Sequence, residues 1–218
     1  MHVVAGVLRD RDGRVLLAER PAGKHLAGGW EFPGGKLDAG EARLEGLIRE
    51  LDEEIGITLS AARPLICVRH QYPQREILLD VWLVTHHRGE PVGLDGQRLR
   101  WCAIDTLAAD ALLPADRPVV TALRLPERLL ALETPAYRIG GAGGDEPADR
   151  LRGMLCDDAA EARAALDIGA EFLALRAALP ANALAALCAA ANVPVFARGV
   201  ALAEAWELGA TGINEIGP

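Results

Sequence analysis

The chain has 218 residues, half of them hydrophobic, and a formal net charge of −8, which suits one large domain or two small ones. The negative charge argues against a protein that binds a nucleic-acid polymer, because such proteins normally present a basic face, and no apolar run is long enough to cross a membrane. The N-terminus lacks the basic start, apolar core and small-residue cleavage site of a signal peptide, so we expect a cytoplasmic protein.

The first part of the chain predicts short strands and two helices. Residues 3–20 predict two strands joined by a turn, because two apolar runs flank RDRDG and Asp12-Gly13 is a hairpin signal. One helix is predicted over 41–55, and another begins near Pro118, since proline fits the first turn of a helix. Branched and aromatic residues predict further strands at 65–70, 76–85 and 100–104.

The composition changes near residue 134. Residues 134–149 are rich in glycine, proline and charge, and are interpreted as a linker. Their glycines do not join a clear strand to a helix, which favours a linker over a phosphate-binding loop. After it, strand-like and helix-like segments alternate, which predicts a parallel sheet of βα units. The predicted organisation is therefore an N-terminal domain over 1–133, the linker, and a second domain over 150–218.

The cysteines are scattered, and none has a CxxC partner or a histidine at ligand spacing. Buried free thiols are therefore expected rather than disulfides or a zinc site. The four positions are Cys67, Cys102, Cys156 and Cys188.

Carboxylates gather on one side of the helix predicted over 41–55. At about 100° per residue, Glu50, Glu53 and Glu54 lie together. Like charges at these spacings destabilise a helix by a few tenths of a kcal/mol per pair, and a solvated acidic face is one interpretation. The other is a site for Mg²⁺ or Mn²⁺, which prefer oxygen ligands, with backbone carbonyls from the FPGGK turn. The apolar side chains cluster on another side of the helix: Leu44, Leu47, Ile48, Leu51 and Ile55.

The spacing from Gly35 onward favours the metal site. The chain reads glycine, five residues, Glu41, seven residues, Arg49-Glu50-Leu51, one residue, Glu53-Glu54, one residue, Gly56-Ile57. This resembles the Nudix box, matched at every defined position. The preceding WEFPGGK is similar to the MutT-type branch, which removes oxidised guanine nucleotides from the nucleotide pool. More weakly, the resemblance extends over residues 1–130.

The resemblance implies an α/β fold, namely an α/β/α sandwich with a mixed central sheet. It also implies metal-dependent cleavage of nucleoside diphosphates linked to another moiety. MutT-type members convert a nucleoside triphosphate to the monophosphate and pyrophosphate. The Nudix resemblance implies that Arg49 and Glu41 orient the box.

The resemblance also implies the metal ligands and the base. The family's ligands carry over onto Glu50, Glu53, Glu54 and the carbonyl of Gly35. They carry over less directly onto Asp95, where MutT has the longer glutamate. Metal ions neutralise the phosphates and acidify a bound water, and a carboxylate then takes its proton. The MutT resemblance makes Glu50 the candidate base, with Glu54 as the main metal ligand and alternative base.

Further candidates would bind the substrate. Lys36 and Arg20 are candidate phosphate contacts, although Arg20 is equally open to interpretation as a solvated strand end. Phe32 aligns with an apolar wall of the MutT pocket and Arg75 with its rim. His25 precedes WEFPGG and is a further pocket candidate, against simple loop exposure.

The base-reading asparagine of MutT falls on Asp116. An asparagine both donates and accepts hydrogen bonds, whereas an ionised aspartate only accepts. Asp116 could accept from an oxidised purine, or be protonated in an apolar pocket. It could also cap the helix that follows it.

The segment 150–218 resembles the C-terminal part of the thiamine phosphate synthase/TenI barrel family, best in GAEFLAL, VPVFARG and LGATGINEI. A complete (β/α)₈ barrel needs on the order of 200–250 residues. The 69 residues from 150 to 218 leave room for four strands and three helices, a partial TIM-barrel-like domain.

The family's phosphate-binding Gly-Gly is Arg198-Gly199-Val200 in this sequence, so we expect no synthase activity. An open parallel sheet needs covering, either by the N-terminal domain or by a second copy in a homodimer.

Together these features predict a Mg²⁺- or Mn²⁺-dependent nucleoside triphosphate pyrophosphohydrolase with 8-oxo-dGTP as the first candidate substrate. One alternative is another pyrophosphate, such as a pterin, an unoxidised nucleotide or a thiamine-related compound. Another is a non-catalytic sensor of a nucleotide or thiamine precursor, against which the complete set of box carboxylates speaks.

Overall fold

The structure of the chain is a computed structural model, and it describes residues 1–107, 112–140 and 150–217. It divides into two compact units, each with its own core. The first unit consists of Met1–Pro64 and Val68–Val120, and the second of Leu65–Cys67 and Thr121–Pro218. None of the helices in the described part of the chain has both the length and the apolar character that crossing a bilayer requires.

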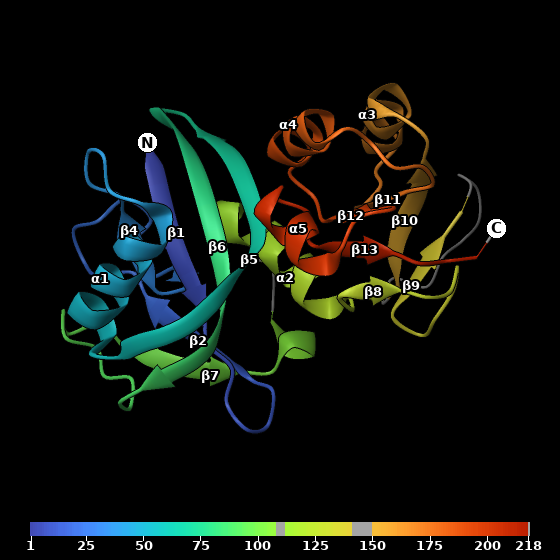
Figure 1. Cartoon of the computed structure of the whole chain (residues 1–218). Helices are drawn as coiled ribbons and strands as arrows, with labels where there is room; N and C mark the ends of the chain where they lie inside the picture. Colours follow the sequence, from blue (N-terminus) through green and yellow to red (C-terminus); the bar gives the residue numbers. More distant parts are fainter. Residues whose placement is uncertain (108–111, 141–149, 218) are drawn as a thin grey trace. The chain divides into compact units, whose positions relative to one another are not determined.

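The first unit contains a mixed sheet, as the sequence predicted. Strand β1 (His2–Val7) lies between β4 (Gly34–Lys36), which is antiparallel to it, and β6 (Arg75–Arg88), which is parallel. Strand β5 (Thr58–Tyr72) follows at the edge beside β6. Figure 1 shows β1, β6 and β5 running side by side. Both β5 and β6 extend beyond the strands predicted at 65–70 and 76–85, because each continues wherever its neighbour offers backbone partners.

A second sheet of the first unit takes the order β3-β2-β7 and is antiparallel throughout. It consists of β3 (Trp30–Glu31), β2 (Val15–Glu19) and β7 (Leu99–Cys102). The predicted turn at Asp12-Gly13 forms, with Gly13 at φ 77°, but β1 and β2 do not make a regular hairpin. The chain pairs briefly around this turn, through an Arg9–Val15 bridge and hydrogen bonds from the NH of Leu16 to the carbonyl of Leu8 and from the NH of Asp10 to the carbonyl of Arg14. β1 and β2 then enter different sheets, because their main partners come from distant parts of the chain.

Helix α1 (Arg43–Ile55) packs against β1 and β4 (Figure 1). It buries Leu47, Leu51 and Ile55, and it ends at Gly56, whose left-handed backbone suits glycine. Leu44 and Ile48 were predicted on the same apolar side, but their side chains are 41% and 38% exposed. The buried stripe is narrower than the apolar stripe of the sequence, since the sheet covers only part of the helix.

The helix predicted near Pro118 is confirmed as α2 (Arg117–Arg124), which follows a 3-10 turn, η3 (Pro114–Asp116). The strand predicted at 100–104 ends at Cys102, and a second 3-10 turn, η1 (Ile104–Thr106), follows. The four cysteines are free, as expected. Only Cys156 and Cys188 are buried, whereas Cys67 and Cys102 are partly exposed, so the expectation of burial is wrong for the latter pair.

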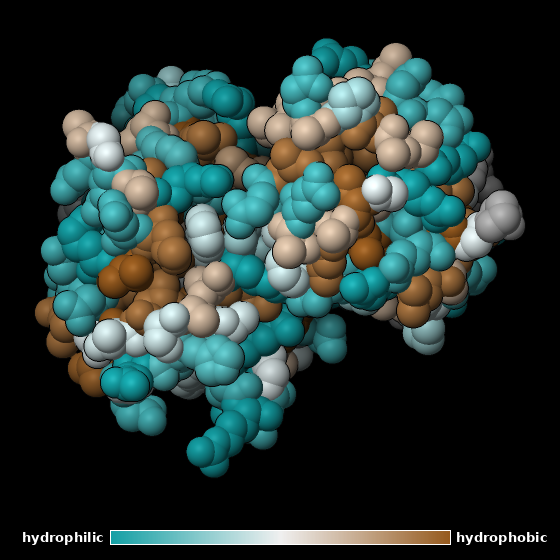
Figure 2. All heavy atoms as spheres, in the orientation of Figure 1, coloured by the Kyte–Doolittle hydropathy of each residue, from teal (hydrophilic) through white to brown (hydrophobic). Residues whose placement is uncertain are grey.

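The second unit is a parallel sheet in the order β8-β13-β12-β11-β10-β9. The predicted alternation after residue 150 is confirmed by strands β10 (Leu151–Cys156), β11 (Phe172–Leu175), β12 (Val195–Ala197) and β13 (Gly212–Asn214), with three helices between them. These helices are α3 (Ala159–Asp167), α4 (Ala181–Ala191) and α5 (Leu202–Glu207). Figure 2 shows pale brown among teal over α4 and α5, as expected of alanine-rich helices.

The segment interpreted as a linker contributes to this second sheet. Strands β8 (Arg128–Leu129) and β9 (Tyr137–Ile139) form its two edges, so the sheet begins before residue 134, and 137–139 are not linker. The backbone NH of Ile139 also donates to the carbonyl of Leu132 at 2.7 Å, which ties 132–139 into a short antiparallel turn. Residues 141–149 of the predicted linker lie outside the described residues.

The two faces of the second sheet are both buried. On one face, α3, α4 and α5 pack over Leu173 and Val195. On the other, Tyr137 and Phe196 each pack edge-to-face against Phe172, with ring centroids 5.6 and 5.9 Å apart. Side chains of the second unit itself thus fill the face opposite the helices. This packing does not require a homodimer, which stays a prediction.

Candidate active site

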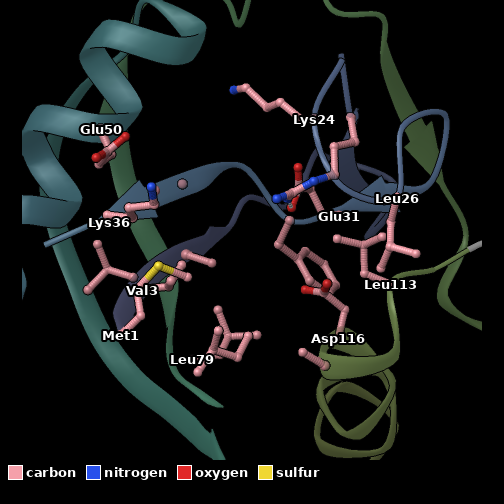
Figure 3. Close-up of a pocket in the computed structure, with 18 of the residues that line it drawn as sticks. Met1, Val3, Lys24, Leu26, Glu31, Lys36, Glu50, Leu79, Leu113 and Asp116 are labelled. Carbon is pink, nitrogen blue, oxygen red and sulfur yellow. Dashed lines mark hydrogen bonds and ion pairs between the residues drawn. The ribbon is translucent and has the colours of Figure 1, made fainter. Parts of the chain in front are cut away.

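A cavity of about 540 Å³ opens in the first unit, a size typical of small-molecule sites. Its two ends differ in character. Figure 3 shows Glu50 and Lys36 at one end and Asp116, Leu113 and Leu26 at the other. The cavity is therefore suited to a ligand with a charged part and a largely apolar part. All eleven predicted site residues line it: Arg20, His25, Phe32, Gly35, Lys36, Glu50, Glu53, Glu54, Arg75, Asp95 and Asp116. Their individual roles stay predictions.

The two glycines of β4 let the chain pass unusually close to its neighbours. A methyl group on Gly34, at φ 151°, would lie 2.1 Å from the carbonyl oxygen of Val4. A methyl group on Gly35 would lie 2.1 Å from Oε2 of Glu50. The missing side chain at Gly35 therefore leaves the space that the Glu50 carboxylate occupies.

Arg49 is the centre of a hydrogen-bond network beside the cavity. Its guanidinium donates to both carboxylate oxygens of Glu41 at 2.8 Å, and to the carbonyl of Lys36 at 3.0 Å. It also donates to Glu50 at 2.9 Å and to Glu53 at 3.2 Å. The bonds from Arg49 hold the pKa of Glu41 down at about 2. The network fixes the loop before α1 to the acidic face of the helix, as the structural roles implied for Arg49 and Glu41 would require.

Glu54 has a different environment. Its carboxylate accepts a hydrogen bond from the backbone NH of Gly34 at 2.6 Å. Burial raises its pKa to about 7, and the nearby charges of Glu31 and Glu50 contribute in the same direction. A cation beside these groups would relieve both effects, since it favours the charged form of a carboxylate.

The donor set at this end of the cavity fits a divalent cation of the Mg²⁺ or Mn²⁺ type. Three carboxylates on one helix, together with the backbone of β4, offer the oxygen ligands that such ions prefer. Within residues 1–107, 112–140 and 150–217, however, no three His, Cys, Asp or Glu side chains stand ready-made around one point. Glu50 and Glu53 are instead engaged by Arg49.

The loop 20–29 brings cations to the cavity. The Arg20 guanidinium is ion-paired with Glu31, and its Nε donates to the carbonyl of His25 at 2.7 Å. Arg20 is therefore partly buried, and the interpretation as a solvated strand end is wrong. Lys24 lies 4.0 Å from the carboxylate of Asp95, which is largely exposed. The His25 ring packs edge-on to Tyr72, with centroids 5.7 Å apart.

Asp116 lies at the other end of the cavity and is only 4% exposed. Its carboxyl group accepts a hydrogen bond from the backbone NH of Phe32. Burial, and then the negative charge of Glu31, raise the pKa of Asp116 well above its usual range. The expected N-cap role is wrong, because Asp116 already belongs to the 3-10 turn that runs into α2, whereas an N-cap has extended backbone.

Several lining residues were not predicted. Glu31 lies within the quoted WEFPGG motif, and its charge was an available signal. The apolar wall was not predictable, because it comes from β1 and β6, which are paired although they lie more than 70 residues apart in the chain. The residues missed in this way include Val3, Ile77 and Leu79. Met1 and Leu113, which lie outside these two strands, were also missed (Figure 3).

Comparison with known proteins agrees with this geometry. The NUDIX domain family model matches residues 4–122. The chain belongs to the NUDIX family. It is 36% identical to the 8-oxo-dGTP diphosphatase of Escherichia coli over 124 residues, which are 57% of this chain and 96% of that protein. It is 37% identical to the CTP pyrophosphohydrolase of the same organism over 122 residues, 56% of this chain and 90% of the relative.

A solved structure of a NUDIX hydrolase is also similar to this chain. The MutT NUDIX hydrolase from Burkholderia pseudomallei is 32% identical, with a TM-score of 0.50 over 55% of this chain and 94% of that protein. The NUDIX chain described here is thus a hydrolase that acts on pyrophosphate bonds, and the alternative of a non-catalytic sensor is set aside.

Proposed function

We propose that the first unit hydrolyses nucleoside triphosphates to the monophosphate and pyrophosphate in the cytoplasm, with 8-oxo-dGTP as its preferred substrate and Mg²⁺, or Mn²⁺, as its cofactor. The observation that carries the proposal is a single cavity that has the acidic face of α1 at one end and the buried carboxyl group of Asp116 at the other. The relatives named for 8-oxo-dGTP support it.

Glu50, Glu53, Glu54 and the carbonyl of Gly35 would hold the cation, with Asp95 as a further ligand. A bound divalent cation neutralises phosphate charge and acidifies water. Lys36 and Arg20 would bind the phosphate oxygens, with Glu31 holding the Arg20 guanidinium in place.

A carboxylate of α1 would take the proton of the attacking water. Glu50 is our first candidate because its carboxylate lies over Gly35, at the charged end of the cavity. Glu54 is the alternative, since the NH of Gly34 holds its carboxylate in a fixed position.

Asp116 would read the base. A protonated carboxyl group, favoured by burial, offers one donor and one acceptor, as an asparagine amide does. Oxidised guanine presents a matching pair, its added N7–H and its neighbouring oxygen. Phe32, Leu113 and Leu79 would pack against the ring, and Arg75 and His25 would lie at the rim.

A second candidate substrate is CTP. An aspartate accepts hydrogen bonds from the amino group of cytosine, and a relative named CTP pyrophosphohydrolase is as similar as the 8-oxo-dGTP diphosphatase. Unoxidised dGTP, pterin triphosphates and thiamine-related pyrophosphates are the remaining alternatives.

A substrate screen with Mg²⁺ tests the proposal. We expect kcat/KM for 8-oxo-dGTP to exceed that for dGTP and CTP by at least about tenfold, the equivalent of one added hydrogen bond. A kcat/KM for CTP higher than that for 8-oxo-dGTP would refute 8-oxo-dGTP as the preferred substrate and favour CTP. Reaction in ¹⁸O-labelled water identifies the phosphorus atom attacked.

The acidic residues are tested by charge removal. Glu50→Gln and Glu54→Gln should each lower kcat by at least about 10²-fold. Glu45→Gln is the matched control, because Glu45 lies on the same helix, is exposed and does not line the cavity. Equal activities in all three variants would refute the assigned roles.

We further propose that the second unit is a partial barrel related to the thiamine phosphate synthase/TenI family and has no synthase activity. Its all-parallel sheet with helices on one face supports the relationship. The aromatic side chains that fill the other face leave it without the open interior of a substrate site. Synthase turnover by the purified chain would refute this. A homodimer through this unit would be detected by light scattering after size-exclusion chromatography.

A further inference from the structure

The loop between β6 and β7 folds back onto the C-terminal end of α1. The backbone NH of Val92 donates to the carbonyl of Ile55, and the NH of Leu94 donates to the carbonyl of Glu54, each at 3.0 Å. These carbonyls belong to the last turn of the helix, where no further helical NH group is available to them. The loop therefore completes the hydrogen bonding of the turn that carries Glu54.

Gln97 strengthens this attachment with its side chain. Its Nε2 donates to the carbonyl of Glu54 at 2.9 Å, and its Oε1 accepts from the backbone NH of Asp95 at 2.9 Å. The residue is only 8% exposed, so both ends of the amide are satisfied inside the protein. Gly93 makes room for Gln97, since a methyl group at Gly93 would lie 2.1 Å from the backbone carbonyl oxygen of Gln97 and 2.9 Å from its Oε1.

Glu54 is consequently held at both ends. Its carboxylate accepts from the NH of Gly34, and its carbonyl accepts from Leu94 and from Gln97. Asp95 is less restrained, because its side chain is 57% exposed and its carboxylate lies 4.0 Å from the ammonium group of Lys24. The amide of Gln97 is thus the side-chain link between the backbone of Glu54 and the backbone of Asp95.

We infer that Gln97 is a positioning residue that sets the distance between Glu54 on α1 and Asp95 on the loop. The inference rests on the proposed function, in which these two acidic residues hold the divalent cation. Residues that orient metal ligands from behind typically change metal affinity or activity by about 10–100-fold when they are replaced. No role for Gln97 followed from the Nudix box, since it lies some forty residues beyond it.

Two substitutions of similar size separate its two hydrogen bonds. Gln97→Met fills the same space and removes both. Gln97→Glu keeps the acceptor for the NH of Asp95 but, when ionised, cannot donate to Glu54. We expect the dissociation constant for Mn²⁺, measured by titration calorimetry, to rise about tenfold or more in both variants, and kcat to fall by a similar factor.

Asn214 offers a matched control in the second unit. Its amide donates to the carbonyl of Leu175 at 2.9 Å and accepts from the NH of Ile216 at 3.1 Å, so it makes the same kind of double link far from the cavity residues in sequence. Asn214→Leu should lower the melting temperature but leave Mn²⁺ affinity and kcat within about twofold. Equal behaviour of Gln97→Met and Asn214→Leu in these two measurements would overturn the inference.

Amide hydrogen exchange gives a readout that does not depend on the metal. In the metal-free protein, the NH groups of Gly34 and Leu94 should exchange faster in both Gln97 variants, and the NH of Asp95 should exchange faster in Gln97→Met, whereas none of them should change in Asn214→Leu. Unchanged exchange at all three would also overturn the positioning role. Should Gln97→Met fail to fold, Gln97→Glu carries the test. If wild type binds no Mn²⁺, the proposed function fails, while the exchange data still decide whether Gln97 restrains this region.

Discussion

Gly35→Ala is the substitution that tests the site geometry most directly. The added methyl group would lie 2.1 Å from Oε2, 2.3 Å from Cδ and 2.6 Å from Oε1 of Glu50. Real contacts of this kind are essentially never shorter than 3.0 Å, so the carboxylate must move by about 1 Å. The Glu50 side chain is flexible enough to do so without unfolding the chain.

The expected effect is on catalysis rather than stability. A displacement of about 1 Å in a catalytic group can cost about 10²-fold in rate, which corresponds to about 2.7 kcal/mol of transition-state stabilisation. We therefore expect kcat to fall by about 10²-fold while the melting temperature changes little. Gly34→Ala should behave differently, because its methyl group would meet the backbone of Val4 and φ is 151° there. The melting temperature of Gly34→Ala should therefore fall together with its kcat.

The assay is steady-state hydrolysis of the best substrate with Mg²⁺, alongside thermal unfolding followed by circular dichroism. The reasoning is refuted if Gly35→Ala keeps kcat within about threefold of wild type, since the site would then tolerate a displacement that should cost about 10²-fold. It is equally refuted if the melting temperature falls by the same amount in Gly35→Ala and Gly34→Ala, because the clash would then lie in the backbone at both positions.

Three further predictions concern other parts of the chain. Arg49→Lys removes the fork that grips Glu41 at two 2.8 Å bonds, and kcat should fall about tenfold; unchanged hydrolysis would argue against that role. Burial raises the pKa of Asp80 above 3.8, so between pH 3.8 and that pKa the folded state binds more protons than the unfolded state. The free energy of unfolding therefore falls as the pH rises through this window. The urea midpoint of Asp80→Asn relative to wild type should therefore increase as the pH rises from 3.8 through the raised pKa, and a constant difference would contradict this. Phe172→Ala should lower the free energy of unfolding by about 3–5 kcal/mol in urea titrations, because the ring is fully buried between Tyr137 and Phe196, and a loss under about 1 kcal/mol would show that the face is loosely packed.

The acidic helix was predictable because its signal is local. The spacing of Glu50, Glu53 and Glu54 determines that they share one side of a helix, and Gly56 terminates it in the left-handed conformation. The βα alternation of the second unit was predictable for the same reason. Each element there is a short continuous segment whose period of hydrophobicity identifies it.

Other features depended on pairing between distant segments. The turn at Asp12-Gly13 suggested a hairpin, yet β1 pairs with β6 and β2 with β7. Residues 134–149 were interpreted as a linker from composition, although 137–139 complete the edge of a sheet. Composition indicates a preference for loops, and the energy of added strand pairing outweighs it where an edge is available.

The sequence by itself indicated the family, the acidic helix and the candidate site residues. The Nudix box lies in one continuous stretch whose spacing carries that signal, and the candidates outside the box came from the weaker resemblance to the MutT-type branch. Only the tertiary structure decided what surrounds that helix: the apolar wall from β1 and β6, the burial of Asp116, the pairing of Arg20 with Glu31, and the link from Gln97 to Glu54. The physical reason is that burial and hydrogen bonding between segments far apart in the chain depend on how all the strands pair, which no local pattern specifies.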